Sequence, residues 1–162
     1  MSKDAVVGDI GTQLRLLQQS FDAFDEAVAT RLGINRTDLR CLDVLLGGGP
    51  LPAGGISEAL KLSPAATTTV IDRLERAGYV TRTRDAGNRR RVLVTATEAA
   101  RAVEAAIFRP VGQAGARALD RYDEGQLAVI LDFLRTAREV QESQTARLAR
   151  AEEARGVTRG QP

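Results

Sequence analysis

The fold of this chain is decided by residues 62–100, LSPAATTTVIDRLERAG (62–78) followed by YVTRTRDAGNRRRVLVTATEAA (79–100). The first part predicts a helix, and residues typical of helix ends lie at both its start and its finish. Ser63 is a favoured N-cap, and Pro64 suits the first helical position, where a missing N–H costs nothing. Gly78 supplies the left-handed residue that closes the helix. One face is expected to be buried, because apolar residues recur there at helical spacing: Val70, Ile71, Leu74 and Ala77.

The opposite face of this helix carries small side chains and one arginine. Small hydroxyl and methyl groups let a helix lie close against a partner, and they suit the base edges and thymine methyls of a DNA major groove. We therefore take this face as a candidate DNA-reading surface. Its residues are Ser63, Ala65, Ala66, Thr68, Thr69 and Arg73.

The second part of the stretch changes to the period of a β-hairpin. Residues 79–84 and 91–95 alternate and are rich in β-branched side chains, and residues 85–88 between them have turn chemistry. Five arginines and a single acid, Asp85, lie between Thr81 and Arg91, a concentration of charge that suits a surface beside phosphates. A helix, a glycine turn and an arginine-tipped hairpin together predict a winged helix. The candidate DNA contacts in the hairpin are Arg82, Arg84, Asn88, Arg89, Arg90 and Arg91.

These residues also carry a family resemblance. The S-P helix start, the D-R-L-E-R-x-G-x-V close, the wing and the T-E entry to the next helix resemble the winged helix of the MarR family of bacterial transcription regulators. The preceding GINRTDLRCLDVLLGGGPLPAGGISEALKL (33–62) resembles the helices that lead into it. The resemblance is close over residues 33–100, whereas the flanking helices match only in layout.

The resemblance implies a function as well as a fold. A member of this family is a homodimeric DNA-binding regulator, most often a repressor, that binds double-stranded DNA at a pseudo-palindromic operator. Many members are released by small aromatic or phenolic ligands, which bind in the crevice between the winged helix and the dimerisation helices. Weak candidates for lining such a crevice are Arg15, Arg36 and Arg40, although arginines on helices are more often simply solvated.

The wing departs from the family pattern at one position. Where the family commonly has D-x-R, an aspartate that holds a minor-groove arginine, this chain has Asn88 and Arg90. An amide accepts a hydrogen bond from a guanidinium but does not neutralise it. We therefore expect Arg90 to carry its full charge into the groove, with Arg89 and Arg91 on the flanking phosphates.

The fold class expected for the whole chain is mainly α (α+β), a winged helix-turn-helix with flanking dimerisation helices. The expected parts are an N-terminal dimerisation helix (1–34), the DNA-binding domain (35–97), C-terminal dimerisation helices (98–150) and a disordered tail (151–162). Within the domain, helices are expected at 36–46 and 53–60, with Gly47–Gly49 in a loop. Thr97 and Asp123 are expected N-caps, and Pro110 is expected to kink or end the helix it interrupts.

The two helical arms carry more apolar residues than a small winged helix can cover. The N-terminal arm has a heptad seam, which favours either packing on its own domain or a shared helix between two subunits. Leaving both arms exposed would be costly, so we expect a homodimer. The seam is Ile10, Leu14, Leu17, Phe21, Phe24 and Val28, and the C-terminal set is Leu127, Ile130, Leu131, Leu134, Ala137, Val140 and Leu148.

Composition narrows the classes of function. The chain has 162 residues, a net charge of only +2, one cysteine and no histidine, so disulfide frameworks, the usual zinc sites and histidine-based triads are excluded. Phosphate-loop and dinucleotide motifs are absent, and we expect no cofactor, no metal and no enzymatic activity. Without a long apolar run or a signal-peptide core, the chain is expected in the cytoplasm and not at a membrane.

Three alternatives stay open. Cys41 lies among apolar positions and is expected to be a small core residue, but a peroxide-sensing thiol is the competing hypothesis. Some members of the resembled family have such thiols near their N-terminus, unlike Cys41. A winged helix can also serve as a protein-interaction module without DNA binding, which the arginine-rich wing argues against. A helical enzyme is disfavoured because no acid–base constellation is present.

Overall fold

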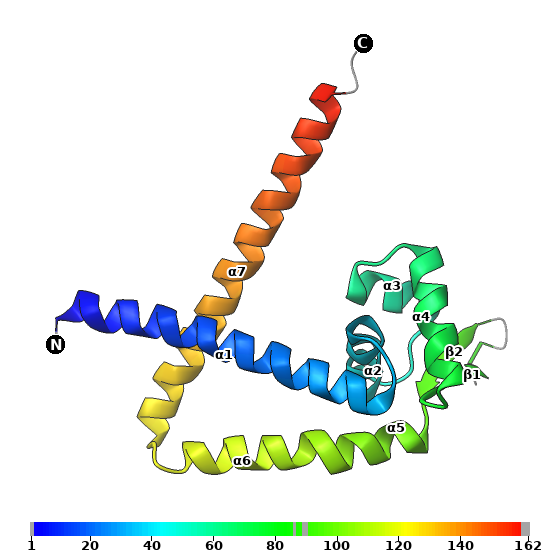
Figure 1. Cartoon of the computed structure of the whole chain (residues 1–162), viewed down its shortest axis with the longest axis horizontal. Coiled ribbons are helices and arrows are strands. Elements are labelled where there is room, and N and C mark those ends of the chain that lie inside the picture. The colour runs from blue at the N-terminus through cyan, green and yellow to red at the C-terminus, as the bar shows by residue number, and fades with distance from the viewer. Residues whose placement is uncertain (1, 86, 89–90, 160–162) are drawn as a thin grey trace. The chain divides into compact units, whose positions relative to one another are not determined.

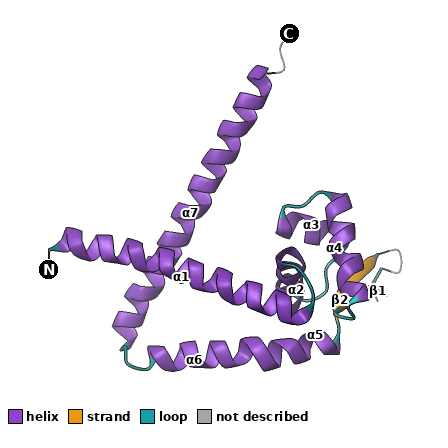
Figure 2. Ribbon diagram, in the orientation of Figure 1, coloured by secondary structure: helices purple, strands orange, loops and turns teal. Residues whose placement is uncertain are grey.

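The computed structural model describes residues 2–85, 87–88 and 91–159, with side chains as far as Ala151. The chain forms two compact units, Met1–Val111 and Gly112–Pro162. The fold is mainly helical with one antiparallel two-stranded sheet, which confirms the expected fold class (Figure 1; Figure 2). The elements are α1 (Lys3–Leu32), α2 (Arg36–Gly48), α3 (Ala53–Leu60), α4 (Pro64–Arg76), β1 (Val80–Arg84), β2 (Val92–Ala96), α5 (Glu98–Val103), the π-helical segment η1 (Glu104–Phe108), α6 (Arg109–Leu119) and α7 (Glu124–Arg159).

The recognition helix α4 begins and ends at the residues that the sequence marks. The Ser63 hydroxyl accepts the Ala66 N–H at 3.3 Å. At the other end Gly78 is left-handed, with φ 79°, and the Tyr79 N–H donates to the Leu74 carbonyl at 2.9 Å. This closing pattern satisfies carbonyls that the helix end would otherwise leave unpaired. It also turns the chain sharply into β1.

Helices α2, α3 and α4 enclose the main core, and the hairpin closes one side of it (Figure 1). Val70, Ile71 and Leu74 of α4 are buried as predicted. Ala77 is exposed, because it follows the last helical turn, and Thr67 is buried in the stripe instead. The Thr67 hydroxyl donates to the Ser63 carbonyl at 3.0 Å, which satisfies the buried oxygen.

The hairpin pairs β1 with β2 from Val80↔Ala96 to Arg84↔Val92. Leu51, in the loop after α2, forms an additional bridge to Val94, with N···O distances of 3.2 and 2.8 Å. The sequence did not predict this bridge. It attaches the base of the wing to the helical core.

Helix α2 runs two residues past its expected end at Leu46 and includes Gly47 and Gly48. It ends at Gly49, which has φ 81° and donates its N–H to the Leu45 carbonyl at 3.1 Å. Only the last glycine of the GGG run therefore belongs to the loop. Helix α3 has the expected bounds.

Pro110 does not end the helix, and the turn that precedes it is π-helical. The helical backbone continues from α5 through η1 into α6, where Pro110 is the second residue. In η1 the Arg109 N–H donates to the Glu104 carbonyl, five residues back. A proline has no N–H and its ring crowds the carbonyl four residues earlier, so a wider turn before it accommodates the ring.

Helix α1 ends at left-handed Gly33, as expected. The last part of its apolar seam packs in a second core: Val28 is buried and the Phe24 ring meets Phe108 edge-on at 5.9 Å. The earlier part is exposed on this chain, including Ile10, Leu17 and Phe21.

The second unit is dominated by α7, whose expected cap is confirmed. The Asp123 carboxylate accepts the Gln126 N–H at 2.8 Å, and the Gln126 side chain accepts the Asp123 N–H at 3.0 Å. The helix runs to Arg159, into the segment expected to be disordered. Ala, Glu and Arg are strong helix formers, which explains the later end. The tail residues 160–162 lie outside the described part, in which no helix is long and apolar enough to cross a membrane.

Candidate nucleic-acid interface

The outer face of α4 presents the small side chains that the sequence predicted. Ala65, Thr68 and Thr69 are exposed, as is Ser63 at the cap, and Ala66 is half-buried. The Thr68 and Thr69 hydroxyls each donate to the carbonyl four residues back, at 3.0 Å. Because each hydroxyl proton is used within the helix, the threonines present methyl groups and acceptor oxygens to a partner.

Arg73 lies at the edge of this face, and it is held by a carboxylate of α2. Its Nε lies 3.1 and 2.9 Å from Oδ1 and Oδ2 of Asp38, and its Nη2 lies 2.6 Å from Oδ1. The Arg73 side chain is 34% exposed, whereas that of Asp38 is 1% exposed. The hydrogen bonds to Asp38 raise the pKa of Arg73, so they favour the charged guanidinium.

Asp38 was not among the predicted site residues. It is the third residue of α2 and completes a capping box, since its carboxylate accepts the Asn35 N–H at 3.4 Å and its own N–H donates to the Asn35 side chain at 2.9 Å. The Asn-x-x-Asp spacing was the available sequence signal for the box. Nothing in the local sequence indicates the bond to Arg73, which is 35 residues away.

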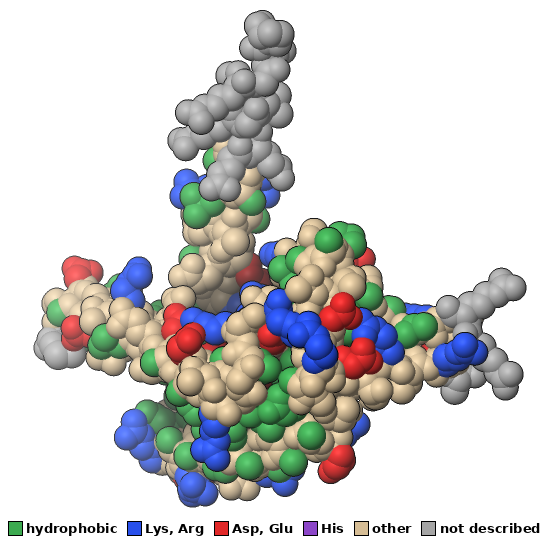
Figure 3. All heavy atoms as spheres, turned by 45° about the vertical axis from the view of Figure 1, so that its right-hand side comes forward, with side chains coloured by type: hydrophobic (Ala, Val, Ile, Leu, Met, Phe, Trp, Pro, Cys, Tyr) green, Lys and Arg blue, Asp and Glu red, His purple; other side chains and the backbone are tan. Residues whose placement is uncertain are grey.

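Arg82, one of the candidate DNA contacts, is held by two acids of α4. It lies on β1 and pairs with Asp72 of α4 at 2.5 Å and with Glu75, one turn further along. The hydrogen bond to Asp72 is the main cause that raises the pKa of Arg82. The ion pairs tie the wing to the recognition helix. Figure 3 shows basic and acidic side chains interleaved on this face of the molecule.

The remaining wing residues lie around the turn of the hairpin. Arg84 and Arg91 are exposed, and the Arg91 N–H donates to the Asn88 carbonyl at 2.8 Å. The Gly87 N–H donates to the Asp85 carboxylate at 2.9 Å, which is typical of turn chemistry. The predicted groove contacts Arg89 and Arg90 lie outside the described residues, and so does the predicted pairing of Asn88 with Arg90.

Cys41 is fully buried in the main core, as predicted from its apolar neighbours. Burial, with a smaller contribution from the charge of Asp38, raises the pKa of the thiol to about 12. The thiolate is the form that reacts with peroxide, so the burial of Cys41 argues against a peroxide-sensing role.

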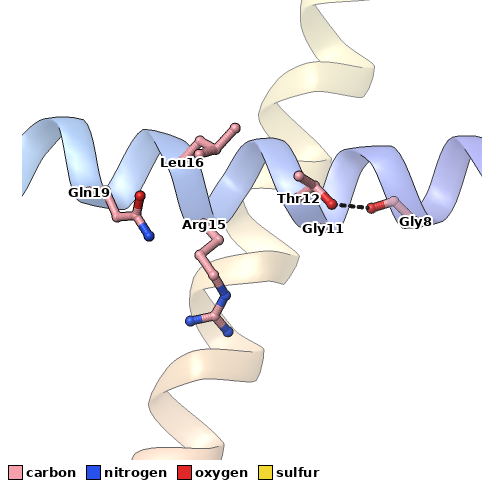
Figure 4. Close-up of a pocket in the computed structure, with 6 residues that line it drawn as sticks. All are labelled: Gly8, Gly11, Thr12, Arg15, Leu16 and Gln19. Atoms are coloured by element: carbon pink, nitrogen blue, oxygen red, sulfur yellow. Dashed lines mark hydrogen bonds between the residues drawn. The ribbon is translucent and has the colours of Figure 1, made fainter.

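The three arginines suggested for a ligand crevice are not gathered in one place. Arg15 lines a shallow pocket of about 410 Å³ on α1, together with Gly8, Gly11, Thr12, Leu16 and Gln19 (Figure 4). Arg36 is held by Asp22 at 2.5 Å and Asp25 at 3.8 Å. Arg40 is exposed one turn further along α2. Within the described part of the chain, no three His, Cys, Asp or Glu residues are grouped to hold a metal ion.

Comparisons with known protein families and with known sequences both match transcriptional regulators. The model of the MarR family matches residues 34–92. An HTH-type transcriptional regulator of Bacillus subtilis, YcgE, is 35% identical over 125 residues, which span 77% of this chain and 81% of YcgE.

Solved structures resemble the fold of this chain over most of its length. A MarR-like transcriptional regulator from Thermotoga maritima has a TM-score of 0.64 at 22% identity and covers 88% of this chain and 98% of its own. A MarR family protein from Bacillus stearothermophilus has a TM-score of 0.61 at 23% identity and covers 90% and 99%. At these identities the structures support the fold, and the sequence relatives support the kind of protein.

Proposed function

The chain belongs to the MarR family of transcriptional regulators, and from this premise we propose that it is a homodimeric repressor of a pseudo-palindromic operator, released by a small aromatic or phenolic molecule. As a family member it is a DNA-binding regulator and not an enzyme. Operator form, dimerisation and ligand release are the proposed parts. The DNA surface is proposed to be the outer face of α4 and the wing.

The observation that carries the proposal is the chemistry of α4. An exposed helix face with small side chains at Ala65, Thr68 and Thr69 fits closely into a major groove. The exposed Arg84 and Arg91 of the hairpin supply positive charge that suits contact with a phosphate backbone. A protein-interaction surface would not need this concentration of arginine.

A homodimer is supported by the apolar side chains that each unit leaves exposed. On α1 these include Phe21, which is 59% exposed, and on α7 they include Val129, which is 70% exposed. Such surfaces are costly in water and usually mark an interface. With two recognition helices related by a two-fold axis, the operator should be a pseudo-palindrome.

The experiment that tests DNA recognition is selection of random duplexes by the protein, followed by footprinting. We expect an inverted repeat whose half-sites are centred about 10 bp apart or a small multiple of that. Affinity should fall steeply with salt, because arginine–phosphate contacts release counterions. A single asymmetric site would contradict the symmetric dimer. Failure to enrich any duplex would favour the protein-interaction alternative.

Repression and ligand release need separate measurements. Transcription in vitro from a promoter that overlaps the selected operator should fall when the protein is added. A thermal-shift screen with small aromatic carboxylates and phenols should find a compound that raises the melting temperature, because it binds the folded state. The same compound should release the protein from the operator. A compound that stabilises the protein but leaves the operator complex intact would contradict release by that compound class.

A further inference from the structure

We propose that Asp38 is a positioning residue for DNA recognition, which holds Arg73 so that the outer edge of its guanidinium reads a guanine in the major groove. The inference rests on the proposed function, since it assigns a role within the same DNA surface. Asp38 itself is buried and does not touch DNA.

The Asp38 carboxylate is held in place by interactions other than the one with Arg73. Asp38 lies in the first turn of α2, where the helix N-terminus favours a negative charge. Its backbone and carboxylate exchange hydrogen bonds with Asn35, at 2.9 and 3.4 Å. Because the side chain is 1% exposed, water does not compete for these bonds.

The geometry of the pair leaves a defined part of Arg73 available. Asp38 takes the side of the guanidinium that carries Nε and one hydrogen of Nη2, at distances of 2.6–3.1 Å. No described residue receives a hydrogen bond from Nη1. Nη1 and the second hydrogen of Nη2 form two parallel donors, which match the O6 and N7 acceptors of guanine.

The position of Arg73 on α4 places it beside the outer face, and its side chain is 34% exposed. Arg73 follows Thr69 by four residues and Ala66 by seven, so the three lie along one flank of the helix. The small side chains at 66 and 69 leave room beside the guanidinium. The arginine is ordered by folding, so DNA binding does not have to restrict its rotamers again.

The test compares specific with non-specific affinity. We would measure binding of wild type, Asp38→Asn and Arg73→Lys to the selected operator, to every single-base-pair variant of it and to a random duplex. Wild type should prefer G·C at one symmetric position of each half-site by about tenfold or more. Both variants should lose that preference, while affinity for the random duplex stays within about twofold.

Arg73→Lys keeps the experiment decisive if Asp38→Asn unfolds the chain. A lysine ammonium neutralises the buried carboxylate, so the fold is retained, but it has no second edge to offer a base. Arg31→Lys, at an exposed position in the last turn of α1, is the matched control and should keep every preference. Thermal unfolding of each variant establishes that it is folded at the assay temperature.

Each remaining outcome rejects the inference. Full base preference in both variants would show that the pair only supports the fold. An equal loss on all duplexes would make Arg73 a phosphate contact. If wild type enriches a duplex and either of these results follows, only this inference fails, whereas if wild type enriches none the proposed function fails with it.

Discussion

Two arginines at the edges of the recognition surface are held by carboxylates, and this changes what each can give to DNA. Arg73 keeps one edge of its guanidinium outside the pair with Asp38. Arg82 meets two acids, Asp72 and Glu75, so a phosphate would have to displace both. The positive charge of an arginine on this surface therefore does not by itself predict a contact with DNA. The carboxylates that pair with each arginine decide which of its N–H donors remain free to bind DNA.

The first prediction separates a positioning arginine from a phosphate contact. Arg82→Ala should weaken operator binding by loosening the wing on α4, without changing the slope of log affinity against log salt. Arg84→Ala, at an exposed residue two positions along β1, should lower that slope by about one. Both slopes come from binding isotherms at several salt concentrations. A slope lower by about one for Arg82→Ala would show that Arg82 neutralises a phosphate after all.

The second prediction concerns Cys41, whose pKa is raised from 9.0 to about 12 by burial. The unfolded chain loses the thiol proton near pH 9 while the folded chain keeps it, so this group favours folding below pH 9 and the contribution is lost as pH rises towards 12. Cys41→Ser should cost about 1–3 kcal/mol near pH 7.5, because it places a hydroxyl in an apolar site. The cost should shrink by about 1 kcal/mol at pH 10.

Urea unfolding of wild type and Cys41→Ser at both pH values measures this difference. An equal cost at both would indicate that the thiol is not shielded in the folded state. Peroxide provides an independent check, since operator binding by wild type and Cys41→Ser should respond identically. A peroxide-triggered release that disappears in Cys41→Ser would restore the redox hypothesis.

At the scale of elements, the residues near each helix end determine where the helix begins and ends. The contacts that join one element to another cannot be read from the local sequence. Ser63, Thr97 and Asp123 act as caps, as their residue types predicted, because a cap depends only on the next few residues. The Leu51 bridge and the Asp38 pair join segments far apart in sequence, and no local pattern encodes them. The candidate DNA face of α4 was predictable from periodicity, whereas the fixation of Arg73 and Arg82 was not.

The third prediction tests the turn that connects α4 with the wing. Gly78 has φ 79°, so Gly78→Ala should cost about 1–2 kcal/mol although no atom blocks the added methyl group. Gly47→Ala is the matched control, because Gly47 is helical and also unobstructed. It should stabilise the protein by up to about 1 kcal/mol. Urea unfolding should therefore give changes in the free energy of unfolding of opposite sign for the two variants. No change for Gly78→Ala would mean that the turn readily takes another conformation.

At the scale of the whole molecule, the winged helix buries its apolar residues, whereas the helical arms α1 and α7 leave many of theirs exposed. The main core under α4 is closed, whereas Leu131 and Leu134 of α7 are each 48% exposed. Exposed apolar residues also lie on the opposite side of α7, including Val129 and Val140. A helix that is apolar on more than one side needs neighbours around it. We infer that a second copy of the chain supplies them.

The last prediction is that charge on the apolar face of α7 separates the subunits. Leu134→Asp would bury an unpaired carboxylate in the proposed interface, a far larger penalty than any surface change. Because Leu134 is half-exposed on the single chain, the winged helix should stay folded in the resulting monomer. Sedimentation should find a dimer for wild type at micromolar concentration and a monomer for Leu134→Asp. A stable wild-type monomer would contradict the dimer directly.

Ala146→Asp controls for the added charge. Ala146 is exposed on the side of α7 shared with Glu139 and Glu142, at spacings of seven and four residues and away from both Leu134 and Val140, so its substitution should leave the dimer intact. Leu134→Asp should also bind the inverted repeat no better than an isolated half-site, because one recognition helix reads only half of the operator. If Leu134→Asp were monomeric yet kept the full preference for the inverted repeat, DNA rather than α7 would hold the two copies together.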